Sequence, residues 1–229
     1  YLATKAKVLV CPSMNVNMYE HPVFQENLAR LKKRGVAVLE PGEGELACGW
    51  EGKGRLPEPE IILAACKSMF STKDLAGKKF LVTAGPTREA VDPVRYISNR
   101  SSGKMGYAIA AAARARGAEV TLISGPVSIA SPAGVNLVKV ESAEEMKRAC
   151  EKYFKDADVI IKAAAVADFR PRAQAREKIK KQKAALSMEM ENTPDILAEL
   201  GKKKRKGQVL VGFAAETNDL IQNAKKKLQ

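Results

Sequence analysis

Residues 80–106 bring together the residue types that bind a phosphate group. The apolar run 80–84 (FLVTA) is short enough for a buried strand, and Gly85 and Pro86 end it. The segment 101–106 (SSGKMG) then opens an alanine-rich stretch that is typical of a helix. Hydroxyl residues and glycines at a helix start leave backbone N–H groups accessible, which favours phosphate binding. The same glycines would also let the helix pack tightly on a sheet, so both interpretations stay open.

A second polar segment, residues 163–171 (AAAVADFRP), follows another apolar run. The small residues 163–165 leave room for a flat base or a ribose against the end of a strand. Asp168 is the one carboxylate in this segment. It could hold a ribose hydroxyl or a divalent cation that bridges a triphosphate. Alternatively it caps a helix or pairs with Arg170, and the sequence does not choose between these roles.

Basic residues are concentrated in residues 170–206, which hold twelve Lys or Arg against five Asp or Glu. Lys178, Lys180 and Lys181 form one basic stretch, and its alanine and glutamine flanks favour a mobile loop. Such a loop over a triphosphate can close on the reacting phosphates and stabilise their developing charge. The run 202–206 is instead interpreted as a solvated helix end and turn.

Strands and helices alternate from residue 78 onward. The predicted strands are 79–84, 119–124, 136–140, 158–166 (the strand together with its exit) and 209–213. The predicted helices are 104–116, 142–154, 194–201 and 219–228. Because several strands are continuous apolar runs, this order predicts an α/β fold with a Rossmann-like parallel sheet and helices on both faces. Ligands of such sheets bind beyond the carboxyl ends of the strands, where TAGPT, AAVADFRP and GFAAET all fall.

Several classes of function are disfavoured. No GxGxxG follows the first strand and no GxxxxGK[ST] occurs, so an ordinary dinucleotide fold or P-loop enzyme fits poorly. No apolar run approaches the roughly 20 residues that span a bilayer, which predicts no membrane segment. The net charge of +13 would suit a nucleic-acid-binding module, but aromatic residues are only 5% and none lies in the lysine runs. We therefore expect an anionic small ligand and no nucleic acid.

The first 70 residues predict part of a second α/β domain. A strand at 7–11, a helix at 21–31 and a strand at 36–39 precede a loop-rich stretch at 41–59 and a short helix at 60–70. This segment is too short for a convincing core of its own, so we expect the tail of a larger domain. The four cysteines are irregularly spaced, which indicates free thiols and a reducing, cytoplasmic compartment. The single histidine excludes a multi-histidine metal site in this chain.

The motifs resemble those of a known family. TAGPT, DPVR, ISNRSSGKMG, AAAVADFRP, KIKK and GFAAET resemble, in this order, the synthetase half of the bifunctional phosphopantothenoylcysteine synthetase/decarboxylase of coenzyme A biosynthesis. Upstream, PSMNVNMY and ACGWEGKGR resemble the PxMNxxMW motif and the substrate-recognition loop of flavin-dependent cysteine decarboxylases. The resemblance divides the chain into part of a decarboxylase domain, residues 1–70, and a C-terminally incomplete phosphopantothenate–cysteine ligase domain, residues 71–229.

The resemblance implies a ligation that uses CTP. The carboxylate of 4′-phosphopantothenate would attack the α-phosphate of CTP, pyrophosphate would leave, and cysteine would displace CMP from the acyl-cytidylate. Mg²⁺ or Mn²⁺ would offset the triphosphate charge. Bacterial bifunctional members use CTP, but the residues alone leave CTP and ATP both open. In the full protein, FMN-dependent decarboxylation would then give 4′-phosphopantetheine.

The resemblance also assigns residues to roles in the ligase. Lys178 would stabilise charge on the α-phosphate, and Asn99 would bind the phosphopantothenate end and help turn over the acyl-nucleotide. Asp168 is the candidate metal ligand. The nucleotide- and phosphate-binding residues are Gly85, Ser101, Ser102, Gly103, Ala164, Asp168, Lys178, Lys180, Lys181 and Phe213.

In the decarboxylase part, the resemblance assigns Asn15 to the substrate carboxylate and Cys48 to protonation of the enethiolate product. Arg55 would close the same clamp, and Tyr19 stands where tryptophan is more usual. The family's flavin-binding strands and catalytic histidine lie upstream of these motifs, so decarboxylation would need that missing part. We expect a homo-oligomer, with a synthetase dimer and a decarboxylase trimer in the full protein. The alternative is a fragmentary remnant that keeps the fold without activity.

Overall fold

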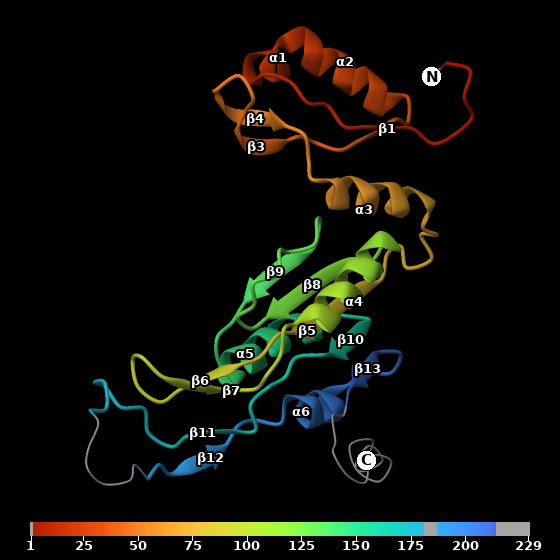
Figure 1. Cartoon of the computed structure of the whole chain (residues 1–229). Helices are drawn as coiled ribbons and strands as arrows, with labels where there is room; N and C mark the ends of the chain where they lie inside the picture. Colours follow the sequence, from red (N-terminus) through yellow and green to blue (C-terminus); the bar gives the residue numbers. More distant parts are fainter. Residues whose placement is uncertain (1, 181–186, 214–229) are drawn as a thin grey trace. The chain divides into compact units, whose positions relative to one another are not determined.

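The computed structural model of the chain describes residues 2–180 and 187–213. The chain divides into two compact units, Tyr1–Ser71 and Thr72–Gln229. The first unit contains the short strands β1–β4, and the second contains a five-stranded sheet (Figure 1).

The first unit combines two short strand pairs with three helices. Its elements are β1 (Leu9–Val10), α1 (Val16–Glu20), α2 (Pro22–Lys33), β2 (Ala37–Val38), β3 (Gly42–Glu45), β4 (Glu51–Arg55) and α3 (Pro59–Phe70). Strand β1 pairs parallel with β2, and β3 pairs antiparallel with β4. Asn15 caps α1 by accepting the N–H of Asn17 at 2.8 Å, and His21 caps α2 by accepting that of Val23 at 3.3 Å.

The hairpin β3–β4 occupies part of the stretch 41–59 that the sequence predicts as loop. Its strands are rich in glycine, which disfavours a strand prediction. The glycines instead make room for packing. A Cβ on Gly54 would lie 2.1 Å from the carbonyl oxygen of Met14, and one on Gly52 would lie 2.9 Å from the Val16 side chain. The hairpin can therefore approach the start of α1, where the Met14 N–H donates to Gly54 at 3.0 Å.

The second unit is built on a parallel sheet of five strands, which confirms the fold class expected from the alternating pattern. The strand order is β13-β10-β5-β8-β9. The strands are β5 (Lys79–Ala84), β8 (Glu119–Ser124), β9 (Asn136–Lys139), β10 (Val159–Lys162) and β13 (Val209–Gly212). Strand β5 is central, and its register pairs Thr83 with Ile123 of β8 and with Lys162 of β10. The carboxyl ends of the strands therefore lie along one edge of the sheet.

Helices cover both faces of this sheet, as predicted (Figure 1). They are α4 (Lys104–Ala115), α5 (Ala143–Phe154) and α6 (Ile196–Lys203). Helix α4 buries a stripe of small residues, Gly106, Ala110 and Ala113, against one face. Helices α5 and α6 pack on the other face, where Met146 and Leu200 are fully buried. Within the described parts of the chain, none of the helices is long and apolar enough to cross a membrane.

Some elements differ from the prediction. The strand and its exit are predicted at 158–166, and the strand itself ends at Lys162, because the residues that follow bond to a neighbouring loop. The helix expected at 194–201 spans Ile196–Lys203. Two short hairpins are additional: β6 (Arg88–Ala90) with β7 (Tyr96–Ser98), and β11 (Phe169–Pro171) with β12 (Met190–Asn192). The helix expected at 219–228 lies outside the described residues.

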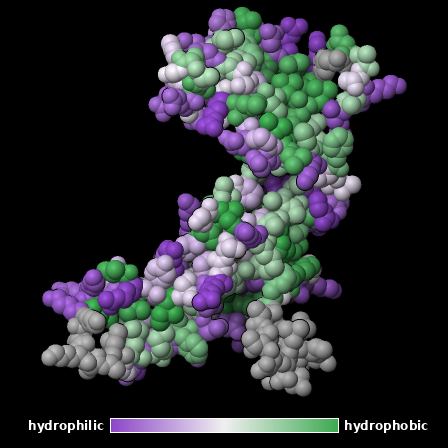
Figure 2. All heavy atoms as spheres, viewed as in Figure 1, coloured by the Kyte–Doolittle hydropathy of each residue, from purple (hydrophilic) through white to green (hydrophobic). Residues whose placement is uncertain are grey.

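The two additional hairpins expose apolar side chains. Val94 is 61% exposed, Tyr96 50% and Phe169 55%. Figure 2 shows apolar residues among polar ones over the region that Figure 1 labels β6, β7, β11 and β12. Exposed large apolar residues that gather on one surface are typical of a contact with another molecule.

Candidate active site

Two loops run side by side at the carboxyl edge of the sheet, one after β5 and one after β10. The hydroxyl of Thr83 accepts the N–H of Ala164 at 3.1 Å, and the carbonyl of Gly85 accepts that of Ala165 at 2.9 Å. The hydroxyl of Thr87 accepts a third N–H of the same loop. These bonds bring the TAGPT and AAAVAD motifs together. The sequence prediction gives these two threonine hydroxyls no joining role, because Thr83 ends an apolar run that indicates only a strand and Thr87 is one residue of a polar loop.

The glycines at the start of α4 pack against the central strand. Gly103 has a φ of +75°, and a Cβ there would lie 3.3 Å from the nitrogen of Gly85. A Cβ on Gly106 would lie only 2.8 Å from a carbonyl oxygen of β5. Tight packing therefore explains why both positions are glycine. Ser102 is exposed and the Ser101 hydroxyl accepts the Gly103 N–H at 3.3 Å, but their role toward phosphate stays a prediction.

Asn99 and Asp168 lie on or beside the same loops. The amide of Asn99 donates to the carbonyl of Val166 at 2.9 Å, so this exposed side chain is held against the loop after β10. Asp168 is exposed, and its carboxylate has no hydrogen bond or ion pair with the described residues. Arg170 pairs with Glu191 at 2.7 Å. The alternative in which Asp168 pairs with Arg170 is therefore wrong, and its carboxylate stays available to a ligand.

A resident metal centre is not built around Asp168. Among the described residues, no group of three or more His, Cys, Asp or Glu side chains could hold a metal ion. Mg²⁺ that is bound mainly by nucleotide phosphates usually takes only one or two carboxylate ligands from the protein. One exposed carboxylate, that of Asp168, is enough for such a site. The residues present therefore fit a cation that arrives with a nucleotide.

Phe213 follows β13 at the same edge. The register pairs Gly212 of β13 with Lys162 of β10, so Phe213 leaves the sheet beside the loop that contains Ala164. The Phe213 ring is half exposed and Ala164 is half-buried. An exposed ring at the end of a strand is suited to contact a nucleotide base. Lys181, the third lysine of the predicted basic stretch, lies outside the described residues.

Lys178 and Lys180 are exposed, but the residue between them has a fixed backbone. The N–H of Ile179 donates to Asp92 at 3.1 Å, and the Arg95 guanidinium donates to the carbonyl of Ile179 at 3.1 Å. Two hydrogen bonds therefore hold this part of the basic stretch, and the mobility of its alanine and glutamine flanks stays a prediction. Asp92 and Arg95 carry no predicted role, because no sequence pattern links positions 87 residues apart.

The first unit brings Asn15 and Cys48 together. The Asn15 amide donates to the Cys48 sulfur at 3.2 Å. The backbone N–H of Trp50, and then the Asn15 amide, lower the pKa of the Cys48 thiol below its ordinary value. Arg55, at the end of the same hairpin, pairs with Glu58 at 3.0 Å, and both side chains are more than half exposed. Such an exposed pair is weak, so Arg55 can exchange it for a ligand.

Tyr19 anchors the hairpin that carries Cys48. Its hydroxyl donates to Glu40, which also pairs with Lys32 at 2.7 Å and with Lys53 of β4 at 3.5 Å. The Lys32 ammonium, and then the Tyr19 hydroxyl, lower the pKa of Glu40 to about 2. The carboxylate therefore stays ionised at neutral pH and ties β4 to the helices. The tyrosine makes this bond through its hydroxyl, whereas a tryptophan would have only its indole N–H to donate.

Replacing Asn15 by Asp is expected to raise the pKa of Cys48. The new side chain keeps an oxygen that can cap α1, but it puts a negative charge where the amide donated to sulfur. Alkylation of Cys48 by iodoacetamide, followed peptide by peptide across a pH series, should move to higher pH by about one unit. Cys66, half-buried in α3, is the internal control and should not shift. An unchanged Cys48 profile would contradict the contact.

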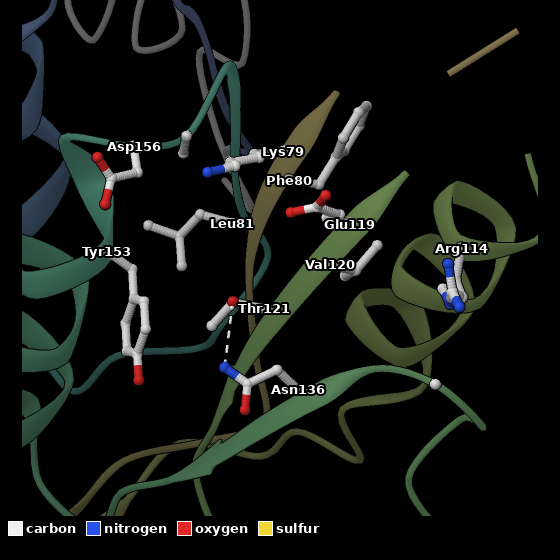
Figure 3. A pocket seen from close by; sticks show the side chains of 12 residues that line it. Lys79, Phe80, Leu81, Arg114, Glu119, Val120, Thr121, Asn136, Tyr153 and Asp156 are labelled. Carbon is white, nitrogen blue, oxygen red and sulfur yellow. Dashed lines mark hydrogen bonds between the residues drawn. The ribbon is translucent and has the colours of Figure 1, made fainter. Parts of the chain in front are cut away.

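A depression of about 420 Å³ lies at the opposite, amino-terminal edge of the sheet. Figure 3 shows Tyr153 and Asp156 on one side of it and Arg114 on the other, with Thr121 bonded to Asn136 at 3.3 Å. None of the predicted site residues lines it. Because ligands of parallel sheets bind at the carboxyl ends of the strands, we place the candidate site at the other edge.

Each of the two units matches a known protein family. Residues 75–229 match the family described as DNA/pantothenate metabolism flavoprotein C-terminal domain, and residues 1–71 match the Flavoprotein family. The chain is 49% identical over 231 residues to the coenzyme A biosynthesis bifunctional protein CoaBC of Bacillus subtilis, covering 99% of this chain and 57% of that protein. It is 48% identical over 235 residues to a cysteine/cysteine sulfinic acid decarboxylase of an unknown prokaryotic organism, covering 100% of this chain and 66% of that protein.

A solved structure agrees with these matches. The C-terminal domain of a coenzyme A biosynthesis bifunctional protein CoaBC superposes with a TM-score of 0.61 at 48% identity, covering 69% of this chain and 74% of that structure. The chain spans 57% and 66% of the lengths of the two relatives above. The two matched families follow the order of the motifs in the sequence. The chain therefore belongs to the DNA/pantothenate metabolism flavoprotein family, with a Flavoprotein segment preceding its C-terminal domain.

Proposed function

We propose that the second unit ligates 4′-phosphopantothenate and cysteine with CTP as the activating nucleotide, as a step of coenzyme A biosynthesis. The observation that carries this proposal is the joined pair of loops after β5 and β10, against which Asn99 is held. The name of the Bacillus subtilis relative supports the pathway. The matched C-terminal domain family supports the assignment of this unit.

In the first half of the reaction, the substrate carboxylate attacks the α-phosphorus of CTP. A new P–O bond forms while the bond to the bridging oxygen breaks, and pyrophosphate leaves with that electron pair. The Lys178 ammonium stabilises the negative charge that builds on the α-phosphate oxygens. Donors from Ser101 and Ser102 hold the phosphates, and the buried Gly103 orders this segment through its N–H bond to the Ser101 hydroxyl. The product is an acyl-cytidylate, in which CMP is a good leaving group.

In the second half, the amine of cysteine attacks the acyl carbon. The C–O bond to CMP breaks, CMP takes the electron pair, and the amine proton passes to solvent. The amide nitrogen of Asn99 is already bonded to the carbonyl of Val166 at 2.9 Å. Its amide oxygen is left to accept an N–H of the cysteine amine and so to orient the attack.

The remaining residues bind the nucleotide. Ala164 leaves space for the base and ribose beside Phe213, while Gly85 lets the loop after β5 pack closely against Val127 and Gly125. Lys180 and Lys181 add positive charge near the triphosphate. Asp168 holds either a ribose hydroxyl or the Mg²⁺ or Mn²⁺ that accompanies the nucleotide, and that cation would offset triphosphate charge.

For the first unit we propose a part in the FMN-dependent decarboxylation of phosphopantothenoylcysteine to 4′-phosphopantetheine. The matched Flavoprotein family and the decarboxylase among the relatives support this proposal. FMN, when bound, supplies the oxidation and reduction chemistry. Asn15 binds the substrate carboxylate, Cys48 delivers a proton to the enethiolate, and Arg55 binds substrate after leaving Glu58. The contact of 3.2 Å between Asn15 and Cys48 fits one small substrate group that touches both side chains.

We also propose that the protein works in the cytoplasm as a homo-oligomer, with a dimeric ligase part and a trimeric decarboxylase part. The exposed apolar side chains of the hairpins β6–β7 and β11–β12 support self-association of the ligase part. Sedimentation analysis of the protein at its natural length would test this. A monomer at micromolar concentration would contradict it.

The ligase proposal is tested by pyrophosphate release. The protein is mixed with 4′-phosphopantothenate, Mg²⁺ and either CTP or ATP, with and without cysteine. We expect release that requires 4′-phosphopantothenate and CTP, and CMP formation that also requires cysteine. Nucleotide binding without release would indicate an inactive remnant of the fold. A protein that binds no nucleotide would refute the ligase proposal and favour a role for its basic surface in binding nucleic acid.

A further inference from the structure

Asp92 is a buried carboxylate that joins two segments 87 residues apart in the sequence. Its Oδ1 accepts the backbone N–H groups of Val94 and Arg95, both at 2.8 Å. Its Oδ2 accepts the N–H of Ile179 at 3.1 Å and an Arg95 guanidinium N–H at 3.2 Å. One oxygen thus shapes the turn in which Asp92 lies, while the other reaches the residue that follows Lys178.

Both backbone groups of Ile179 are bound to this turn. Its N–H donates to Asp92, and its carbonyl accepts the Arg95 guanidinium at 3.1 Å. Four residues earlier, the N–H of Ala175 donates to the carbonyl of Val91 at 3.0 Å. A residue held at both its donor and its acceptor has little freedom to move. The backbone beside Lys178 is therefore fixed, although the Lys178 side chain is exposed.

The turn that holds Ile179 is itself fixed to the candidate site. It connects β6 to β7, and the hydroxyl of Ser98 in β7 donates to the carbonyl of Thr87 at 2.7 Å. The next residue, Asn99, bonds to the loop after β10. The hairpin β6–β7 thus has one end on the two joined loops and the other on the backbone beside Lys178. The hydrogen bonds at the two ends of this hairpin therefore connect the backbone beside Lys178 to the two joined loops.

The charge of Asp92 supports this arrangement. Burial raises the pKa of its carboxyl, but the backbone N–H groups of Val94, Ile179 and Arg95, together with the Arg95 guanidinium, outweigh burial and lower that pKa below its ordinary value. Asp92 is therefore ionised at neutral pH. An ionised carboxylate only accepts hydrogen bonds, which matches the four donors around it.

We propose that Asp92 is a positioning residue for the ligation, which fixes the backbone beside Lys178 so that the ammonium is held ready for the nucleotide phosphates. This inference rests on the proposed function of the second unit. A side chain whose backbone is already ordered loses less entropy when it engages a charge that appears only in the transition state. The loss of Asp92 should therefore act mainly on kcat.

The substitution Asp92→Asn distinguishes two roles of Asp92, that of holding Ile179 and that of shaping its own turn. The amide can keep its oxygen on the N–H groups of Val94 and Arg95, but it then presents an NH₂ group to the N–H of Ile179. Two donors cannot bond to each other, so Ile179 is released while the turn is kept. We expect at least about tenfold faster hydrogen exchange at the Ile179 amide. We expect kcat for pyrophosphate release to fall by about 10- to 100-fold, with less change in KM for the nucleotide.

Asp158→Asn is the matched control. Asp158 also accepts a backbone N–H, that of Lys79 at 2.8 Å, but at the opposite edge of the sheet. Its loss should leave Ile179 exchange and kcat unchanged within about twofold. Asp92→Ser is the second variant in case Asp92→Asn does not fold. A serine hydroxyl can still accept within the turn, but it is too short to reach Ile179, so the same results are expected.

Three results separate the possible failures. Faster Ile179 exchange with unchanged kcat would overturn the positioning role while the ligase function stands. Unchanged exchange in both Asp92 variants would overturn the tether itself. If the unmodified protein releases no pyrophosphate, the ligase function fails, and with it the catalytic role of Asp92, whereas Ile179 exchange would still report the tether.

Discussion

Replacing Lys178 by Gln is expected to slow pyrophosphate release from CTP by a factor on the order of 10² to 10³. Glutamine keeps most of the length and polarity of lysine but has no charge. The attack of a carboxylate on the α-phosphorus brings two negative groups together, so the transition state needs a positive charge at that phosphate more than the bound substrates do. The loss should therefore lie in kcat, with a smaller change in KM for CTP.

A second lysine distinguishes this local effect from a change in overall charge. Lys202 is exposed in the last turn of α6, so Lys202→Gln removes the same charge from a solvated position. We expect its pyrophosphate release to stay within about twofold of the unmodified protein. Equal losses in the two variants would mean that the net charge of +13 attracts the nucleotide and that Lys178 has no special place. Full activity in Lys178→Gln would refute its assignment.

The central sheet could be predicted because each strand is defined by its immediate neighbours in sequence. Strand β8, Glu119–Ser124, is an apolar run between Gly117 and Gly125, and the structure gives the predicted bounds. The helix after TAGPT ends where Gly117 adopts a φ of +96°. Such signals lie within a few residues of the element that they define, so the sequence alone reveals them.

The strand pairs β3–β4 and β11–β12 could not be predicted, because contacts with residues outside each strand define them. In β3–β4 the glycines disfavour a strand, and the fit of Gly52 against Val16 and of Gly54 against Met14 explains the pairing. In β11–β12 the two strands are three residues each, and Arg170 meets Glu191 across them at 2.7 Å. Neither pairing has a local pattern that distinguishes it from a loop.

Some residues of the candidate site could likewise be predicted from the sequence, and others could not. The resemblance supplied the residue types that would contact substrate, and the structure brings Asn15 and Cys48 together in the first unit. In the second unit it joins the loops that contain Gly85 and Ala164. The groups that hold such residues in place escaped prediction, because their bonds cross long stretches of chain. Asp92 is the clearest case, since only the fold shows that it reaches Ile179.

Gly125→Ala is expected to lower the stability of the second unit by about 3 kcal/mol. Gly125 follows β8, and a Cβ there would lie 1.7 Å from the carbonyl oxygen of Pro86 and 2.8 Å from its carbon. These are backbone atoms, so no side chain can rotate away to relieve the overlap. The loop after β5 would have to move, and it is fixed by the bond from the Thr87 N–H to Ala165 at 3.3 Å. The midpoint of thermal unfolding should fall by roughly 6 to 12 °C.

Gly201→Ala is a control that should raise the stability of the second unit, whereas Gly125→Ala should lower it. Gly201 lies inside α6, and a Cβ there would meet only a side-chain carbon of Leu210, at 4.0 Å, which is ordinary van der Waals contact. Alanine in a helix interior is more stable than glycine by about 0.5 to 1 kcal/mol, because it restricts the unfolded chain. Calorimetry should therefore show the unfolding midpoint of the second unit rising in Gly201→Ala and falling in Gly125→Ala. If Gly125→Ala leaves this midpoint unchanged, the close approach of the two loops is wrong, and so is the geometry of the site that depends on it.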